Sequence, residues 1–472
     1  MLSTSLFVEQ LTPTGGAGHP FDQMELQFSE AVRDGTFTLA DVTLTGPIGE
    51  IAPSALNKLA ADRYELVVTG LTGLNTYTLE VGPDILADAT GDQMDQDRDG
   101  TPGQAGDGYT AALFANGATI ADGDGTYDDG SLVIYGNTVT VNGAHTFDVV
   151  DVAGGATVNA NGDTLGVYNL SLTGASTVNL AGGSTTTAQE AIVLTGNSTL
   201  VCRSIDNTAE VGGEWIGEGV TINAANLTVE AGSVITADGQ GYVTFCGPGG
   251  GGYGGGGSYG GAGSGSAAGP TYGSNTFPVD LGSGGGRGNS ISWSYGGGAI
   301  RLDVTGTMTL DGEVSADAQT GGPYADGASG GSIFVTAATL VGSGRFTADG
   351  KSGYSSAHGG GGRIAVYYNT DGGFTGFSTS TASAGGTGAG HGTTAFFDRS
   401  VPDYLMDVYQ HYEVAQHTEI SLGSLVLHDA TFWIGGGTTV DVAGDLHVLG
   451  SSTVICRSID NTAEVGGEWI GE

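Results

Sequence analysis

The chain of 472 residues has few basic residues and few cysteines. Lysine and arginine together number 12 against 51 aspartates and glutamates, and the lysines are Lys58 and Lys351. The net charge of −39 repels phosphate backbones and anionic lipid headgroups, so we expect no nucleic acid and no membrane as partners. No apolar run approaches the roughly 20 residues that a membrane span needs. The segment after Met1 also lacks the basic start and long apolar middle of a signal peptide.

Three cysteines in a chain of this length exclude a disulfide scaffold. Cys202 and Cys246 form a disulfide or remain two buried free thiols, and the sequence leaves both alternatives open. The spacing of cysteine and histidine matches no metal site.

Glycine is what the chain has in excess: it supplies 90 residues, against a usual share of about 7%. The hydrophobic share of 39% is still enough for a core. The densest glycine stretch covers residues 247–298 and contains Tyr253, Tyr259, Tyr272 and Trp293. Such a stretch forms either a flexible surface loop or an adhesive tongue with aromatic contact points. We favour the flexible loop outside the core.

One segment occurs twice without change. CRSIDNTAEVGGEWIGE starts at Cys202 and again at Cys456, an offset of 254 residues. The stretches from Thr177 and from Thr431 are similar at the same offset. Similarity at a long fixed period indicates a tandem array. We therefore expect a segment of a longer repetitive protein, with any export signal upstream and with last coils that fray or pair end to end.

Residues 6–118 contain short alternating runs rich in Val, Thr, Tyr, Phe or Leu, at 24–28, 36–44, 64–68 and 76–81. Strands of this length and spacing favour an antiparallel β-sandwich. The segments FSEAVRDGTFTLADVTLTGPIG and TYTLEVGPDILADATGDQMDQDRDGTPGQAGDGYTAALF resemble the bacterial Ig-like domains of the S-layer-protein type. The resemblance covers the first quarter of the chain and implies a spacer or adhesive module outside the cell.

From residue 130 onward the pattern changes to repeated short strands with glycine clusters before most of them. Segments 219–239, 299–318 and 332–350 each indicate three strands separated by short breaks, and a fourth opens the same way at 363–368. Regular hairpin turns are not consistently present, so the pattern predicts stacked coils of a right-handed parallel β-helix. It resembles the glycine-rich β-helical repeats of giant bacterial surface proteins.

The sequence thus predicts an all-β chain, or β-solenoid, in four parts. An Ig-like sandwich covers 1–118 and an acidic glycine-rich linker covers 119–130. A first β-helical unit covers 131–395, with the insertion at 247–298, and a truncated second unit covers 396–472.

The strongest candidate site is an acidic loop. It contains alternating aspartates, a glycine and two further oxygen donors: Asp95, Asp97, Asp99, Gly100, Thr101 and Asp107. Carboxylates at i, i+2 and i+4 before a glycine surround a calcium ion, and the carbonyl of Thr101 supplies another oxygen. The loop departs from an EF-hand because position 12 is Gly106 and no helices flank it. The sequence predicts Ca²⁺ here, against the alternative of a solvated acidic turn.

Other acids surround this loop in the sequence. Asp88 and Asp92 are near enough to complete the shell of ligands. A second acidic patch in the linker fits a solvated turn better than a metal site: Asp122, Asp124, Asp128 and Asp129.

Signatures of catalysis are weak. GxSxG occurs at Gly256–Gly260 and Gly327–Gly331, but chance matches are expected in glycine runs, and no strand-to-helix elbow is predicted there. Asp238, Asp317 and Asp349 occupy one equivalent position in three coils and should stack about 4.8 Å apart. Stacked acids resemble the sites of β-helical polysaccharide hydrolases and lyases, yet an acid in every coil fits a structural repeat better.

These features favour a secreted or cell-surface structural or adhesion protein rather than an enzyme. Its partners would be other copies or repeats of itself, extracellular matrix or glycans. The alternative is a calcium-dependent polysaccharide lyase or glycoside hydrolase on a β-helix. One groove with convergent acids and a base or aromatic platform would favour the enzyme, whereas smooth repetitive faces would favour the stalk.

Overall fold

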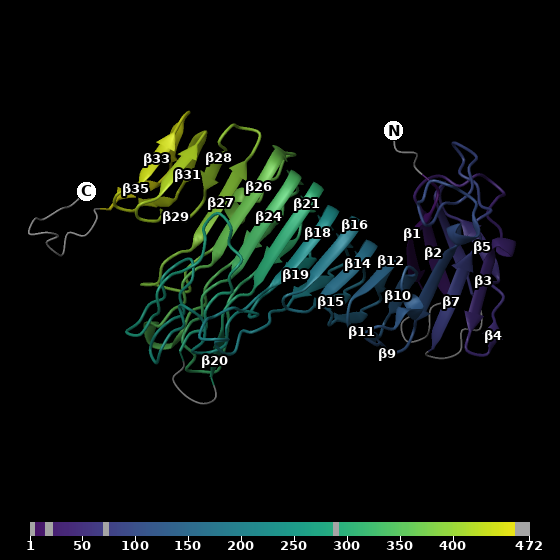
Figure 1. The fold of residues 1–472 in the computed structure, drawn as a ribbon, viewed down its shortest axis with the longest axis horizontal. Helices are drawn as coiled ribbons and strands as arrows, with labels where there is room; N and C mark the ends of the chain where they lie inside the picture. The colour runs from purple at the N-terminus through teal and green to yellow at the C-terminus, as the bar shows by residue number, and fades with distance from the viewer. Residues whose placement is uncertain (1–4, 15–21, 69–74, 287–291, 458–472) are drawn as a thin grey trace, which may run out of the picture. The chain divides into compact units, whose positions relative to one another are not determined.

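The computed structural model describes residues 5–14, 22–68, 75–286 and 292–457, and in these ranges the chain is all-β (Figure 1). It divides into two compact units, Met1–Asn179 with Thr186–Leu200 and Leu180–Thr185 with Val201–Glu472. No helix in the described ranges is long and apolar enough to cross a membrane. The helices found there are 3-10 turns of three residues: η1 (Leu39–Asp41), η2 (Ala105–Asp107), η3 (Gly125–Tyr127), η4 (Tyr354–Ser356) and η5 (Phe377–Thr379).

Antiparallel strands open the first unit. One sheet holds, in order, β1 (Val8–Thr14), β2 (Gln23–Phe28), β6 (Arg63–Val67) and β5 (Ala55–Lys58). A second antiparallel group holds, in order, β4 (Gly49–Glu50), β3 (Val42–Gly46), β7 (Thr76–Val81) and β8 (Tyr109–Phe114). Apolar residues of both groups, such as Leu26 and Leu79, belong to one core. The predicted strands at 24–28, 64–68 and 76–81 correspond to β2, β6 and β7.

The predicted strand at 36–44 is wrong over residues 36–41. Thr38 and Asp41 form a capping box around η1: the N–H of Thr38 donates to Asp41 Oδ2 (2.7 Å), and the Thr38 hydroxyl accepts from the N–H of Ala40 (3.3 Å). These local bonds close a turn, so the strand begins only at Val42.

Parallel coils follow in the first unit. One row of strands runs from β8 through β10 (Ser131–Tyr135), β12 (His145–Ala153), β14 (Thr164–Leu172) and β16 (Thr185–Leu194). A second row holds β9 (Ala118–Ile120), β11 (Thr138–Val141), β13 (Thr157–Ala160), β15 (Thr177–Leu180) and β17 (Thr199–Cys202). Corner residues Gly136, Gly154, Gly174 and Gly196 all have φ between 61° and 65°. Glycine adopts this left-handed conformation at little cost, which keeps the corners of successive coils alike.

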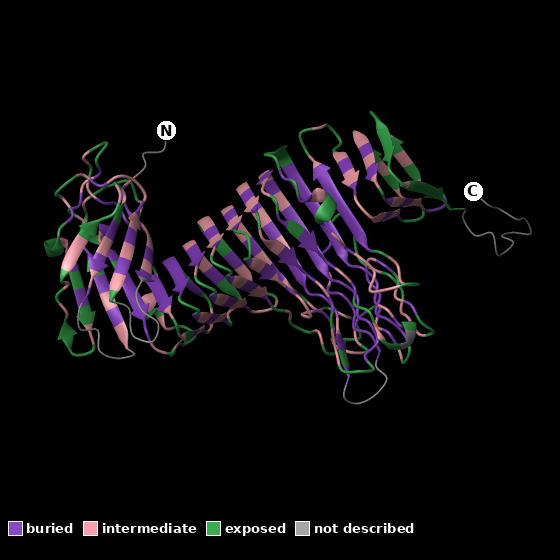
Figure 2. Cartoon of the chain, turned by 180° about the vertical axis from the view of Figure 1, so that it is seen from behind, coloured by how far each residue is buried: buried purple, intermediate pink, exposed green. Residues whose placement is uncertain are grey.

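The second unit also contains parallel rows. One holds β18 (Val220–Val229), β21 (Ala299–Leu310), β24 (Ser332–Val341), β26 (Arg363–Asp371) and β27 (Thr393–Asp398), and the other β19 (Val234–Thr236), β22 (Glu313–Ser315) and β25 (Arg345–Thr347). Buried residues recur along these strands (Figure 2). The long parallel sheets are consistent with a β-solenoid.

Each predicted coil segment contains two strands rather than three. In 219–239 the first two predicted strands are the single strand β18, and in 299–318 they are the single strand β21. The register between these strands shifts between Ala224 and Leu227. The expected break is therefore an irregularity of the bulge type, which re-aims side chains without ending the strand.

The strand direction reverses between β27 and β28 (Leu405–Val408), which pair antiparallel. Parallel pairing then resumes from β28 to β31 (Ser424–His428) and β34 (Leu446–Leu449). The same coils contain the parallel set β29 (His411–Val414), β32 (Thr431–Ile434) and β35 (Thr453–Cys456), and the parallel pair β30 (Glu419–Leu422) and β33 (Thr439–Val442).

The sequence repeat is visible in the strands. The bounds of β29, β32 and β35 follow those of β13, β15 and β17 at the offset that separates Cys456 from Cys202. The equivalence therefore reaches back to Thr157, upstream of the similarity at Thr177. Val448 and Val454 of the last described coil are exposed. Residues 458–472, which hold most of the second copy of the repeated segment, lie outside the described residues.

The glycine-rich stretch is packed, so the prediction of a flexible loop is wrong for its described part. Backbone hydrogen bonds join it to distant segments: the N–H of Gly282 donates to Gly297 O (2.8 Å), and that of Gly261 to Gly361 O (2.8 Å). At many of these glycines an added Cβ would lie closer than 3.0 Å to backbone of a neighbouring segment. We call this set of segments the glycine bundle: residues 247–286, 296–298, 327–331, 359–362 and 385–392.

The glycine bundle is anchored on solenoid strands. Tyr259 is fully buried, and its hydroxyl group is hydrogen-bonded to that of Ser332 on β24 (2.6 Å). Arg363 on β26 donates two hydrogen bonds to the carbonyl oxygen of Tyr272 (3.0 and 2.7 Å). A short antiparallel pair is formed by β20 (Trp293–Tyr295) and β23 (Gln319–Gly321). The stretch packs because backbone segments without Cβ atoms approach one another closely.

The three cysteines are free thiols. Cys202 is buried, and burial raises the pKa of its thiol to about 12. Cys246 is only partly buried, and its thiol donates to the carbonyl oxygen of Thr208 (3.4 Å). Of the two alternatives open from the sequence, the structure shows free thiols.

Candidate metal centre

The acidic loop connects β7 to β8 in the first unit. Arg98 and Gly100 have left-handed φ angles of 60° and 84°. The backbone N–H of Asp99 donates to Asp97 Oδ1 (3.0 Å), and that of Thr101 donates to Asp99 Oδ1 (2.7 Å). Side-chain bonds to the backbone two residues on are turn-forming, and they curl the loop so that its alternate carboxylates converge.

The structure brings Asp95, Asp97 and Asp99 together. One carboxylate oxygen from each lies within 4.8 Å of the other two. Asp95 is buried, whereas Asp97 and Asp99 are exposed. Among the described residues no other three potential ligands gather in this way, so Asp88 and Asp92 lie outside the cluster.

Asp107 ends η2 and is fully buried. Burial raises the pKa of its carboxyl group, the N–H of Gln104 lowers it, and the charges of Asp97 and Asp95 raise it further. Both charges act on Asp107 because its carboxyl group lies near theirs. Asp107 is therefore a neighbouring acid that interacts with the cluster, but it is not one of the three whose carboxylate oxygens lie within 4.8 Å of one another.

Thr101 is exposed, and its carbonyl oxygen accepts a hydrogen bond from the side-chain amide of Gln104 (3.1 Å). The same amide donates to Asp99 Oδ2 (3.0 Å). The N–H of Thr101 and then the Gln104 amide lower the pKa of Asp99. Gln104, which the sequence did not single out, thus holds two of the predicted ligand oxygens close together.

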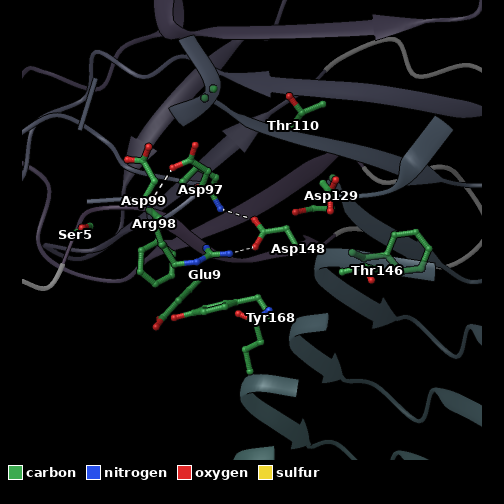
Figure 3. A pocket seen from close by; sticks show the side chains of 18 of the residues that line it. Ser5, Glu9, Asp97, Arg98, Asp99, Thr110, Asp129, Thr146, Asp148 and Tyr168 are labelled. Atoms are coloured by element: carbon green, nitrogen blue, oxygen red, sulfur yellow. Dashed lines mark hydrogen bonds and ion pairs between the residues drawn. The ribbon is translucent and has the colours of Figure 1, made fainter. Parts of the chain in front are cut away.

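A groove of about 1590 Å³ opens beside the loop within the first unit (Figure 3). Its acidic lining residues are Glu9, Asp92, Asp97, Asp99, Asp128, Asp129, Asp148 and Glu190. Among the lining residues only Arg98 carries a lysine or arginine charge. The lining of the groove is therefore strongly negative, and the guanidinium group of Arg98 is its basic group.

Arg98 crosses the groove to the coils. Its guanidinium group pairs with Asp148 on β12 and lies 3.5 Å from the ring centre of Tyr168 on β14 (Figure 3). The ring of Phe7 lies 5.0 Å from the same group. Gln96 donates to Asp148 Oδ2 (2.8 Å). The loop residues between the aspartates therefore contact the solenoid.

Sequence reasoning missed these contacts. Arg98 stands between Asp97 and Asp99 in the sequence, and a base at this position indicates a partner outside the cluster of acids. Asp148 and Tyr168 gave no such signal, because only the stacking of the coils brings β12 and β14 to the loop.

Two of the four acids of the linker, Asp124 and Asp128, have side-chain partners in the protein. Asp124 accepts from the N–H of Thr126 (3.1 Å), and Asp128 is paired with His145 Nδ1 (2.8 Å). The first bond caps η3, and the second joins the linker to His145 at the start of β12.

Asp238, Asp317 and Asp349 stack in three coils. The N–H of Asp317 donates to Asp238 Oδ1 (2.7 Å), and the N–H of Asp349 donates to Asp317 Oδ1 (2.7 Å). Each carboxyl group therefore ties its own coil to the next. We call this row the aspartate ladder.

The serines of the two GxSxG matches lie in the glycine bundle. Ser258 and Ser329 are fully buried. The hydroxyl of Ser258 donates to Gly269 O (2.6 Å), and that of Ser329 donates to Ser283 O (3.3 Å). Both hydroxyls are bound to the backbone.

No protein-family model matches this chain, and no curated protein sequence matches it.

Proposed function

We propose that this chain is part of a secreted or cell-surface structural or adhesion protein. Its N-terminal strands form an S-layer-type Ig-like sandwich, and its coils form tandem units of a right-handed parallel β-helix. It provides reach and rigidity and contacts copies of itself, extracellular matrix or glycans. The supporting observation is the repeat: β13, β15 and β17 recur with matching bounds as β29, β32 and β35. Repeated coils that stabilise their neighbours are typical of scaffolds.

The side chains at equivalent positions support the same function. Each member of the aspartate ladder bonds the next coil, whereas a catalytic group is normally a single departure from a repeat. The net charge of −39 fits a solution rich in cations, as outside the cell.

One observation favours the second function, a calcium-dependent polysaccharide lyase or glycoside hydrolase. The groove combines acids, a base and aromatic rings. Glu9 and Glu190 both line it, and burial followed by the charge of Glu190 raises the pKa of Glu9. A carboxyl pair of this kind can supply a proton donor and a base. Against the enzyme, Arg98 is already held by Asp148 and Tyr168.

The two functions make different predictions for the whole chain mixed with insoluble matrix polysaccharides in calcium buffer. The scaffold should be retained on at least one polysaccharide, or self-associate in light scattering, and should release no reducing ends or unsaturated products. Glu9→Gln should behave like the wild type, as should the control Glu50→Gln, which is exposed on β4. Product formation that is lost in Glu9→Gln alone would establish the enzyme. A chain that is neither retained on any polysaccharide nor self-associated would contradict adhesion.

A further inference from the structure

We propose that the acidic loop binds one calcium ion, and that this ion holds Gln96 and Arg98 in the positions that join the N-terminal strands to the first coils. The proposed ligands are the three clustered acids Asp95, Asp97 and Asp99, together with Asp107 and the carbonyl group of Thr101. This inference does not depend on the proposed function. It uses only contacts of the acidic loop within the first unit, and these contacts are the same whether the protein is a scaffold or an enzyme.

The donors identify the class of ion. All of them are oxygens, and the cluster contains no histidine or cysteine, so it suits a hard cation rather than a transition metal. Calcium accepts about six to eight oxygens in a flexible arrangement, whereas magnesium needs a compact octahedron and retains water. Four carboxyl groups on an irregular turn fit calcium better.

Two buried oxygens point to a ligand independently of the spacing. Asp95 and Asp107 are both 0% exposed, and Oδ1 of each has no hydrogen-bond partner. Their other oxygens are bonded, Asp95 Oδ2 to the hydroxyl of Ser5 (2.7 Å) and Asp107 Oδ2 to the N–H of Gln104 (2.5 Å). A buried polar atom without a partner is destabilising. A cation in the cluster would satisfy both atoms.

The proposed ligands Asp95, Asp97 and Asp99 alternate along the backbone with Gln96 and Arg98, the two residues that join the N-terminal strands to the coils. Gln96 binds both main-chain groups of Val8: the N–H of Val8 donates to Oε1 (2.8 Å), and Nε2 donates to the carbonyl oxygen (3.1 Å). Its Nε2 also donates to Asp148 (2.8 Å), which is the partner of Arg98. The side chains of Gln96 and Arg98 thus bind β1 and β12. The side chains of Asp95, Asp97 and Asp99 converge on one another.

Electrostatics couples the two sets of side chains. Without a cation the converging carboxylates repel one another, which loosens the curl of the loop. Gln96 and Arg98 share that backbone, so they lose their alignment with Asp148 and Tyr168. Bound calcium removes the repulsion, and binding is therefore linked to the order of the joint.

Isothermal titration of the full chain with CaCl₂, after removal of divalent ions with a chelator, tests the site. We expect one site, and at least a tenfold loss of affinity in Asp97→Asn and in Asp107→Asn. The control Asp163→Asn, an exposed acid of the first unit, should bind as the wild type does. Absence of a calcium-binding signal in the wild type, or equal affinity in all variants, would overturn the site.

Hydrogen exchange of residues 164–172 tests the coupling. Calcium should slow exchange there in the wild type and in Arg63→Ala, whose arginine pairs with Glu25 at the surface. Arg98→Ala should still bind calcium within about threefold of the wild type but lose this protection. Exchange that is indifferent to calcium in the wild type, or still responsive in Arg98→Ala, would overturn the coupling even where the ion binds.

Discussion

Replacing Gly361 by alanine is expected to lower the melting temperature of the second unit by about 6 to 12 °C. A Cβ at this position would lie closer than 3.0 Å to the carbonyl oxygen of Ala382 and to the amide nitrogen of Gly392. Overpacking against fixed backbone costs about 3 kcal/mol, and each kcal/mol is worth about 2 to 4 °C in a unit of this size. Differential scanning calorimetry of the full chain measures the change.

Gly252→Ala is the matched control in the same glycine bundle. The nearest atom to its added Cβ is the side-chain carbon of Ala267, at 3.1 Å. A small shift relieves this contact, so we expect a change of less than about 2 °C, in line with about 1 kcal/mol or less. Equal melting temperatures for the two variants would show that the bundle is not closely packed.

Asp317→Asn is expected to stabilise the second unit by about 4 kcal/mol at pH 8 and to leave it nearly unchanged at pH 4. Burial, together with the charges of Asp238 and Asp349, raises the pKa of Asp317 to about 7. Because the folded pKa lies above that of the unfolded chain, the contribution of Asp317 is greatest below about pH 4. It is lost as the pH rises through about 7.

The substitution removes the charge and keeps the hydrogen bond. The amide oxygen of asparagine still accepts from the N–H of Asp349, as Asp317 Oδ1 does at 2.7 Å. Urea unfolding between pH 4 and pH 8 should show a smaller loss of stability in Asp317→Asn than in the wild type. Asp441→Asn, an exposed acid on β33, should follow the wild type. A wild type that becomes more stable above pH 7 would contradict the raised pKa.

The coils were predictable because their chemistry is local and repeated. Alternating apolar residues marked the strands, and the equivalent positions of Asp238, Asp317 and Asp349 predicted the aspartate ladder. The breaks within β18 and β21 were not predictable as bulges, since a polar interruption in a strand looks the same in sequence whether the strand ends or shifts its register.

The glycine bundle could not be predicted for a different reason. A run of glycines has no side-chain pattern, and composition alone favours a flexible loop. The packing depends on distant backbone partners, such as Gly297 for Gly282 and Gly361 for Gly261. Buried Tyr259 and its bond to Ser332 on β24 show that the aromatic residues of the stretch include anchors.

The candidate site also has one part that was predictable from local spacing and one part that depends on distant contacts. The spacing of Asp95, Asp97 and Asp99 predicted converging acids, and the structure brings them together. The partners of Arg98 follow only from the stacking of β12 and β14 beside the loop. The convergence of the acids was therefore within reach of sequence reasoning, and the contacts of Arg98 with the coils were not.

The glycine bundle is a packed part of the solenoid, and hydrogen exchange over residues 249–286 tests this central structural claim most directly. We expect the backbone N–H groups of Gly257, Gly261 and Gly282 to exchange at least a hundredfold more slowly than in an unstructured chain, because each donates to a distant segment. Exchange at the unstructured rate across the whole stretch, in a chain whose coils are protected, would contradict the account.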